Sequence, residues 1–344
     1  MTQAKQRVDG VFEGGGMKGI GLVGAASVIE AAGYEFVNLA GTSAGAIVAT
    51  LLAAGYRADE LKSIISELDF STFEDPPLIG RVPLVGAFVD MLFRKGLYRG
   101  DVFLNLMRDL LARKNIHTFR DLLLPEFAND ERYRFKVRLI ASDISRGRML
   151  VLPQDIHDYG VAPEDLEVAL AVRMSMSIPF FFEPVKFKGS YIVDGGVLSN
   201  FPIELFDSAG VPEWPTFGFK LVLPDQMAPM LVVEHPINGP MSELAALFFT
   251  AMEAHDAYYL KNDKFVRTIA IDTLNVGTTD FNLNAEQKEA LYASGMQAAR
   301  TFLAHWSFEQ YKILYRSGQP VPSRRAQMLP TLLLPAPSPP VTPR

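Results

Sequence analysis

Twice within its first 56 residues, the chain passes from a short apolar run through glycines into a helical pattern. The first run, residues 8–12, breaks into Gly14-Gly15-Gly16. The second run, residues 36–40, enters the turn Gly41-Thr42-Ser43-Ala44-Gly45. Strand–turn–helix units in succession pair their strands in parallel, in a sheet that is covered on both faces. The sequence therefore predicts an α/β fold with a mostly parallel central sheet flanked by helices on both faces.

The rest of the chain continues this pattern. The further strands expected are 133–141, 191–193, 216–222 and 266–271, with a hairpin turn within 142–153; the expected helices are 20–32, 46–54, 102–113 with Asp101 as its N-cap, 242–261 and 285–306. The segment near 70–100 interrupts the rhythm with three prolines and a tract of mixed apolar and basic residues, and we expect it to form a cap.

Three parts of the chain are expected from this pattern. They are a core over 8–207 that includes the cap, a C-terminal part of the same domain over 208–319, and a proline-rich flexible tail over 320–344. No internal repeat is visible in the sequence, so a repeat architecture is not expected.

The composition argues against several classes of site and partner. With a formal net charge of −6 and a pI near 5.5, the chain lacks the basic balance of a nucleic-acid-binding protein. It has no cysteine, so disulfides and thiolate metal sites are impossible. We see no signal peptide and no uninterrupted apolar run of about 18 residues. We expect a soluble, cytoplasmic protein without metal or cofactor, able to act peripherally at a membrane; export without an N-terminal signal stays open.

The turn at 41–45 has the Gly-x-Ser-x-Gly pattern of a nucleophile elbow. Gly41, Gly45 and the small Ala44 suit a turn so tight that larger side chains would collide. Such a turn raises the Ser43 hydroxyl above the sheet, at a helix N-terminus whose dipole favours a developing negative charge. The alternative is an ordinary strand–helix turn in which Ser43 caps the helix. The flanking strand and helix favour the nucleophile.

The earlier glycine run fits an oxyanion site better than a cofactor site. Gly14-x-Gly16-x-x-Gly19 matches the dinucleotide fingerprint, but the second strand does not end in the acidic residue that such a site needs. A P-loop fails as well, because Gly19 rather than Ser or Thr follows Lys18. Three consecutive glycines let backbone amides face an oxyanion without obstruction, and Lys18 adds positive charge.

None of the five histidines lies in a strand-end turn beside glycine, where a triad would place its base. An acid does. Asp194 follows an apolar strand and precedes Gly195-Gly196, so it should lie at the same sheet edge as Ser43. Taken alone, Asp194 fits a simple Asx turn equally well.

The three motifs Gly14–Gly19, Gly41–Gly45 and Asp194-Gly195-Gly196, in this order, resemble the patatin-like phospholipase family. That family has a glycine-rich oxyanion loop, a GxSxG elbow and a DG[AG] box with the second half of a Ser-Asp dyad. The stretch Ser175–Val185 is also similar to the family, and Lys18 stands where many members have arginine. The likeness covers about Asp9–Asp207 and implies a three-layer α/β/α fold and an active enzyme.

The resemblance also implies roles for single residues. Ser43 would be the nucleophile and Asp194 the base, with oxyanion donors from the amides of Gly14–Gly16 and Ala44. Burial should raise the pKa of Asp194 from its usual value near 4. The implied substrates are acyl esters of phospholipids, lysophospholipids or other glycerolipids, so the expected partner is a lipid or membrane surface. Leu84–Arg99 is expected to wall the acyl pocket or to lie at an anionic membrane surface.

Two other functions stay open at this stage. An acyl-carrier transacylase of the malonyl-transfer type uses a similar elbow, but it commonly has histidine where Thr42 stands and a histidine as base. A non-catalytic anion- or nucleotide-binding module would use the glycine loop alone. Asp194 separates the three functions, because only the hydrolase requires it.

Overall fold

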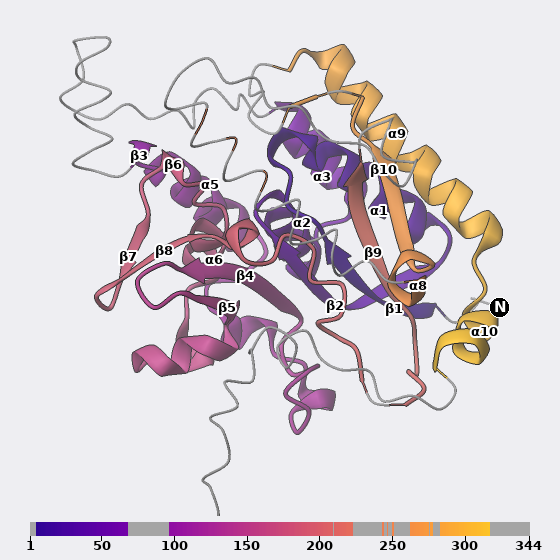
Figure 1. Cartoon of the computed structure of the whole chain (residues 1–344), viewed down its shortest axis with the longest axis horizontal. Coiled ribbons are helices and arrows are strands. Elements are labelled where there is room, and N and C mark those ends of the chain that lie inside the picture. The colour runs from indigo at the N-terminus through magenta and orange to yellow at the C-terminus, as the bar shows by residue number, and fades with distance from the viewer. Residues whose placement is uncertain are drawn as a thin grey trace, which may run out of the picture.

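One eight-stranded sheet forms the centre of the molecule (Figure 1). The structure, a computed structural model, describes residues 5–67, 96–208, 210–222, 262–274, 276–277 and 283–316, together with Glu243, Ala246 and Thr250. Strands from the beginning and from the later part of the chain lie side by side in the sheet, so sequence-distant segments share one core.

The strand order is β10-β9-β1-β2-β4-β8-β7, and β5 also pairs with β4. In chain order the strands are β1 (Gln6–Phe12), β2 (Tyr34–Thr42), β4 (Val137–Asp143), β5 (Arg148–Leu152), β7 (Val185–Phe187), β8 (Ser190–Asp194), β9 (Thr216–Val222) and β10 (Thr268–Asp272). The strands from β10 to β4 run parallel, whereas β5, β7 and β8 pair antiparallel. A separate two-stranded sheet joins β3 (Gly96–Tyr98) to β6 (Phe180–Phe182).

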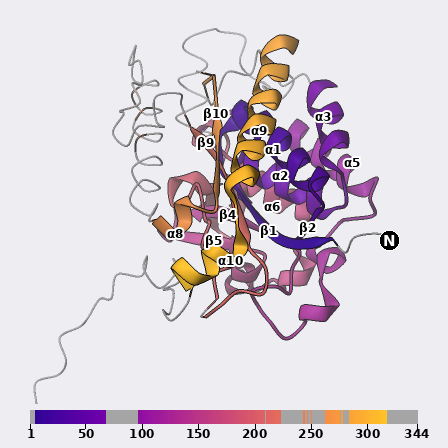
Figure 2. The same ribbon diagram turned by 90° about the vertical axis from the view of Figure 1, so that its right-hand side faces the viewer.

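Helices follow most of the strands. They are α1 (Ile20–Ala31), α2 (Ala44–Ala53), α3 (Ala58–Glu67), α5 (Asp101–Ala112), α6 (Val168–Ser175), α8 (Asn262–Phe265), α9 (Ala285–His305) and α10 (Phe308–Tyr311). Short turns of 3₁₀ helix lie at Gly16–Gly19, Phe119–Leu122, Pro125–Phe127, Gln154–Tyr159, Pro163–Asp165 and Gly195–Val197, and a π turn at Lys312–Arg316. Figure 2 shows α1, α2, α3 and α9 on one side of β9 and β10, and α8 on the other.

Successive residues of β1 face two different apolar clusters. Val8 and Phe12 are buried in the main core, to which α1, α2 and α9 contribute. Val11 instead joins a smaller cluster with Phe201, Ile203 and Phe206. Because side chains alternate across a strand, the segment that follows β8 covers the face of β1 opposite the main core. This segment also contains the residues that follow Asp194, so the second cluster anchors the chain next to the candidate site.

The mostly parallel α/β sheet with helices packed around it confirms the expected fold class. The strands expected at 8–12, 36–40, 191–193 and 216–222 and the helices expected at 20–32, 46–54, 102–113 and 285–306 are present with small shifts of their ends. The hairpin expected within 142–153 is the antiparallel pair of β4 and β5.

Two expected details are wrong, the start of the strand at 133–141 and the N-cap of the helix at 102–113. The strand expected at 133–141 begins at Val137, because residues 134 and 136 hydrogen-bond to the segment 122–124 instead. The strand expected at 266–271 is present with small shifts of its ends, as β10, which begins at Thr268 after α8 and a turn. Asp101 is not an N-cap: Gly100, at φ 71°, precedes α5, and Asp101 is the first helical residue.

Several expected segments lie outside the described residues. They are most of the cap near 70–100, of which residues 96–100 are described, nearly all of the helix expected at 242–261, and the tail at 320–344. None of the helices that the structure does describe is long and apolar enough to cross a membrane.

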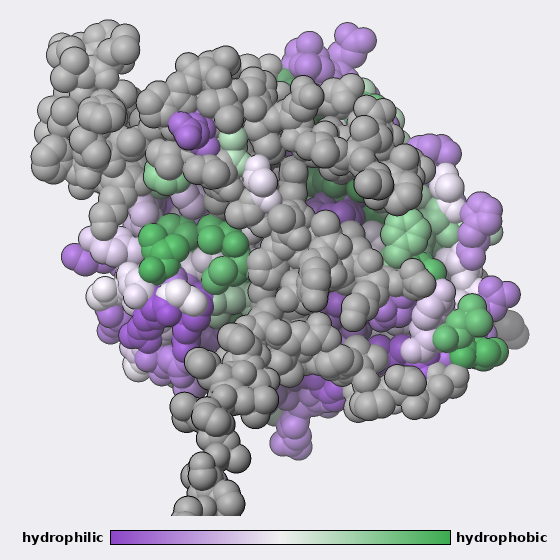
Figure 3. All heavy atoms as spheres, viewed as in Figure 1, coloured by the Kyte–Doolittle hydropathy of each residue, from purple (hydrophilic) through white to green (hydrophobic). Residues whose placement is uncertain are grey.

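The C-terminal end of the described chain carries apolar surface. Ile313 and Leu314, in the π turn after α10, are 68% and 70% exposed. Figure 3 shows an apolar group over α10, at the lower right of the view. A few exposed apolar side chains are ordinary for a folded domain, so we assign no role to them.

Candidate active site

The serine turn is a tight, strained connection between β2 and α2. Ser43 lies between Thr42, the last residue of β2, and Ala44, the first of α2, with φ 52° and ψ −122°. A non-glycine residue at positive φ is uncommon and strained, and persists only where the surroundings enforce it. Here the backbone on the two sides of Ser43 packs closely together, because a Cβ on Gly41 would lie 2.2 Å from the Gly45 carbonyl oxygen. The turn therefore has the geometry that the sequence pattern predicts.

Strand pairing explains why Asp194 lies beside this turn. Thr42, at the end of β2, pairs with Ile140 of β4. Asp194, at the end of β8, pairs with the next residue, Ala141. β2 runs parallel to β4 and β8 runs antiparallel, so the two strands end at neighbouring positions of β4. Ser43, one residue beyond Thr42, is thereby brought next to Asp194.

The carboxyl group of Asp194 is buried, and few hydrogen bonds offset the cost of burying its charge. It is 2% exposed, and its Oδ1 accepts a hydrogen bond from the Gly196 N–H at 2.7 Å. Its Oδ2 makes no hydrogen bond of ordinary length to any described residue. Burial raises the pKa of Asp194 to about 7, although the Gly196 amide and the Ser43 hydroxyl both favour its charged form. The carboxyl group can therefore exist in either protonation state near neutral pH, as a general base requires.

The glycines after Asp194 allow the chain to pass close to β4. A Cβ on Gly195 would lie 2.3 Å from the Ile140 carbonyl oxygen, so no larger residue fits without a shift of backbone. Gly195 and Gly196 begin a short 3₁₀ turn that Asp194 caps through its bond to the Gly196 amide. The DGG motif thus keeps the carboxyl group near Ser43 rather than merely forming an exposed turn.

The three glycines of the first loop have different roles. Gly14 lies against the serine, because a Cβ there would come within 3.1 Å of Ser43 Cβ. Its N–H, however, donates to the Asn200 carbonyl at 3.2 Å, so the expectation that Gly14 offers an oxyanion donor is wrong in this conformation. The amides of Gly15, Gly16 and Ala44 have no partner among the described residues. These amides are the ones free to bind an anion.

The rest of this loop packs on the elbow. A Cβ on Gly19 would lie 3.0 Å from Ala44 Cβ, so Gly19 permits close contact with the start of α2. The Lys18 N–H donates to the Gly15 carbonyl at 3.2 Å, and the lysine side chain is half-buried. Gly16, at φ 55°, supplies a left-handed turn that glycine adopts without strain.

Two serines that the sequence did not single out support the elbow and the acid. The Ser43 N–H donates to Ser175 Oγ at 3.1 Å, and the Ser175 hydroxyl donates to the Ile140 carbonyl at 2.6 Å. The Asp194 N–H donates to the Ser177 carbonyl at 2.9 Å. Both serines lie in the stretch that begins at Ser175, whose likeness to the family was the one sequence feature that pointed to them.

The described histidines lie at the surface. His117, His157 and His305 are exposed, and none of them hydrogen-bonds to Ser43 or Asp194. His235 and His255 fall outside the described residues. Within the part of the chain that the structure describes, no group of acidic and histidine side chains could hold a metal ion.

An apolar cavity of about 60 Å³ lies beside the elbow. Gly16 and Ala44, which carry two of the free amides, border it. The other walls come from the glycine loop, the start of α1, α2, α3 and α5 and are apolar: Met17, Gly19, Ile20, Ile47, Val48, Leu51, Ile64, Ile65, Phe103, Leu106, Met107 and Leu110. Pockets of this composition bind apolar groups. Most of Leu84–Arg99, expected to wall such a pocket, lies outside the described residues, but the following helix α5 does line it.

Comparison with known families agrees with this geometry. A sequence model described as patatin-like phospholipase matches residues 10–207, which include the glycine loop, the elbow and the DGG motif. The chain belongs to the patatin-like phospholipase family. The uncharacterized protein YqhO of Bacillus subtilis is 39% identical over 305 residues, which cover 88% of this chain and 99% of YqhO.

More distant relatives extend the comparison. The protein named probable lipid hydrolase 463L of Invertebrate iridescent virus 6 is 26% identical over 205 residues, covering 57% of this chain and 61% of the viral protein. Among solved structures, VipD from Legionella pneumophila superposes with a TM-score of 0.51 at 19% identity, covering 88% of this chain and 67% of VipD. At that identity the likeness to VipD concerns the fold alone.

Proposed function

We propose that this patatin-like protein is a serine acyl hydrolase that cleaves fatty acyl esters of phospholipids or related glycerolipids. The observation that carries the proposal is the meeting of a strained Ser43 with a buried Asp194 that has no charged partner among the described residues and whose pKa burial raises to about 7. Family membership and the viral relative named as a probable lipid hydrolase support the choice of lipid esters.

In the first half of the proposed reaction, Ser43 Oγ attacks the ester carbonyl carbon, and its proton passes to Asp194. Oδ2 is the acceptor, since Oδ1 already accepts from Gly196. The carbonyl oxygen becomes an oxyanion, which the amides of Gly15, Gly16 and Ala44 bind. The intermediate then expels the alcohol, which takes the proton from Asp194 and leaves an acyl ester on Ser43.

In the second half, water attacks the acyl ester. Asp194 accepts a proton from the water, the oxyanion forms again at the same amides, and Ser43 leaves with that proton while the fatty acid departs. Each oxyanion donor in acyl-transfer sites is worth about 3 kcal/mol, so the glycine loop would supply a large part of the rate enhancement. The half-buried Lys18 adds positive charge to this loop.

The apolar cavity favours a fatty acyl chain over a polar acyl group. It begins at Gly16 and Ala44, where the carbonyl carbon would be held, and none of the described residues that line it carries a charged side chain. A malonyl group, by contrast, needs a cationic partner for its free carboxylate. The cavity therefore argues against a malonyl-type transacylase, and the buried acid beside Ser43 argues against a mere anion-binding module.

The test is active-site labelling followed by hydrolysis of a lipid panel. A fluorophosphonate probe should label the wild-type protein but not Ser43→Ala. Free fatty acid should then be measured from phosphatidylcholine, lysophosphatidylcholine, diacylglycerol and a short-chain p-nitrophenyl ester. Labelling that survives in Ser43→Ala, or labelling without any ester hydrolysis, would contradict the proposal. Transfer of the acyl group to an added acyl-carrier thiol in preference to water would favour a transacylase.

A further inference from the structure

Asn200 fastens the glycine loop to the segment that follows Asp194. Its Nδ2 donates to the Gly14 carbonyl at 3.1 Å, and its own carbonyl accepts from the Gly14 N–H at 3.2 Å. One residue earlier, the Ser199 carbonyl accepts from the Thr42 hydroxyl at 3.0 Å. Asn200 is only 5% exposed. Three segments therefore meet here: the glycine loop, the end of β2 next to the serine, and the turn after the acid.

The contact leaves little room for adjustment. A Cβ on Gly14 would lie 2.2 Å from Asn200 Oδ1 and 3.1 Å from Ser43 Cβ. The carboxamide and the serine thus lie against the same side of Gly14. Because two hydrogen bonds join Asn200 to this one residue, a shift of Asn200 displaces the backbone that continues into Gly15 and Gly16.

We infer that Asn200 is a positioning residue, which holds the free amides of the glycine loop in register with Ser43 and Asp194. The inference rests on the proposed hydrolase function and names a residue that acts through others, without touching the reacting atoms. Oxyanion donors stabilise the transition state rather than the bound substrate, and small displacements of them are costly. Loss of the Asn200 contact should therefore lower kcat and leave KM nearly unchanged.

Asn38 provides a matched control. Like Asn200 it is buried, its Nδ2 donates to backbone carbonyls (Tyr133 at 3.1 Å and Phe135 at 3.0 Å), and its Oδ1 has no partner among the described residues. It fastens the chain before β4 instead of the glycine loop. Replacing either asparagine removes the same kind of bond, but only Asn200 joins the loop to the site.

The first experiment compares Asn200→Ala with Asn38→Ala in the full chain, using a p-nitrophenyl ester and correcting for the folded fraction. We expect Asn200→Ala to lose about 10- to 100-fold in kcat with KM within about threefold, and Asn38→Ala to keep kcat within about threefold despite a comparable loss of Tm. Hydrogen exchange in residues 13–19 should accelerate only in Asn200→Ala. Equal kcat losses in the two variants, or unchanged exchange in the loop, would overturn the inference.

Asn200→Asp is the second variant, since it keeps the size of the side chain if Asn200→Ala does not fold. It removes the donor to the Gly14 carbonyl and adds a negative charge on the side of Gly14 that faces Ser43, the residue that hydrogen-bonds to Asp194. A nearby like charge disfavours ionisation of a carboxyl group, so the acid limb of the kcat profile should move to higher pH by about half a unit or more. A wild-type kcat with an unmoved acid limb would contradict the inference.

Failure of the proposed function would be seen separately, as absence of Ser43-dependent hydrolysis in the wild type. The exchange measurement needs no turnover. In that case it still decides whether Asn200 orders the glycine loop more than Asn38 does.

Discussion

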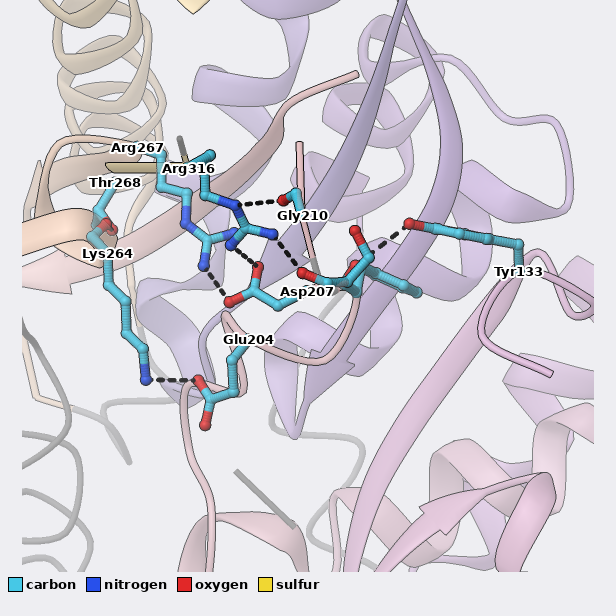
Figure 4. Close-up of polar contacts among 10 residues, drawn as sticks. Tyr133, Glu204, Asp207, Gly210, Lys264, Arg267, Thr268 and Arg316 are labelled. Atoms are coloured by element: carbon cyan, nitrogen blue, oxygen red, sulfur yellow. Dashed lines mark hydrogen bonds and ion pairs between the residues drawn. The ribbon is translucent and has the colours of Figure 1, made fainter. Parts of the chain in front are cut away.

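Asp194 and Asp207 are both buried carboxyl groups on the same stretch of chain, but their surroundings are opposite. Asp207 accepts a hydrogen bond from Arg267 Nη2 at 2.8 Å and lies 3.9 Å from Arg316 Nη1. Nearby, Glu204 pairs with Lys264 at 3.4 Å, so several ion pairs lie together (Figure 4). Among the residues that the structure describes, Asp194 has only the Gly196 amide and the Ser43 hydroxyl to offset its burial.

The difference shows two ways of keeping a carboxyl group out of water. A buried charge is paired, or it becomes neutral through a shifted pKa. Asp207 is paired with arginine. Arg316 also joins the segment after β8 to the C-terminal end of the described chain, through bonds to the Ser208 and Gly210 carbonyls at 2.6 and 3.3 Å. Asp194 is left able to exchange a proton. The first arrangement serves stability and the second suits catalysis.

The largest effect is expected for Ser43→Ala. Hydrolysis of a p-nitrophenyl ester should fall by about 10⁴-fold or more, because removing the nucleophile of an acyl-transfer site costs that much. The fold should survive, since alanine also fits the tight turn. The checks are kcat/KM and a thermal melt of the same preparation. Turnover clearly above background in this variant would remove Ser43 from the mechanism.

Asp194→Asn should lose almost as much activity, about 10³- to 10⁴-fold. Asparagine keeps the size of the side chain and can accept from the Gly196 amide, but it cannot take a proton. Asp207→Asn is the contrasting variant, and its kcat per folded molecule should stay within about fivefold of wild type.

Single alanine replacements of the exposed His117, His157 and His305 should also leave turnover intact. One histidine variant as inactive as Ser43→Ala, with Asp194→Asn still active, would reverse our assignment of the base.

For the free energy of unfolding we expect the reverse order of effects: Asp207→Asn should destabilise the protein, whereas Asp194→Asn should not. Asp207→Asn leaves the guanidinium of Arg267, which is 1% exposed, without its carboxylate. Breaking one partner of a buried ion pair typically costs about 3–5 kcal/mol. The exposed pair of Arg120 and Asp165 is the control, and Asp165→Asn should leave the free energy of unfolding almost unchanged. Urea unfolding of both variants measures the difference; similar small losses would mean that the buried pair adds little.

Features set by neighbouring residues could be predicted from the sequence. The elbow, the DGG turn and most strands and helices depend on local patterns of glycine and apolar residues, and the order of the motifs identified the family. A boundary could not be predicted where a distant segment decides it. Residues 134–136 look like the start of a strand but bond to 122–124. Gly100 precedes α5 in a left-handed conformation, and a Cβ at this position would overlap with the Arg173 side chain.

The candidate site shows the same limit. Sequence spacing pointed to Ser43 and Asp194, but not to the strand register on β4 that brings them together. It also assigned an oxyanion role to Gly14, whose amide is taken by Asn200. That bond joins residues almost a whole core domain apart, so no local pattern reveals it.

The smallest expected effect is a change in the pH dependence of stability, and it tests the Asp194 environment directly. The pKa of Asp194 is raised to about 7 in the folded protein from 3.8 in the unfolded chain. Between these values the folded state binds more protons than the unfolded state, so the free energy of unfolding falls as pH rises. The stabilising effect of the protonated acid is complete below about pH 4 and lost by about pH 7. Asparagine does not titrate, so Asp194→Asn should remove this part of the slope.

We expect Asp194→Asn to match the wild type near pH 4 and to exceed it by about 2 kcal/mol at pH 8. A three-unit shift converts to about 4 kcal/mol, and we take half of it because structural relaxation reduces such penalties. Part of the slope should remain, since burial also raises the pKa of Asp9 to about 7 despite the opposing charges of Arg138 and Arg267. Urea unfolding at about pH 4, 6 and 8 measures the difference between variant and wild type. If both show the same slope, the Asp194 carboxyl is not destabilised in its charged form, and its contrast with the paired Asp207 disappears.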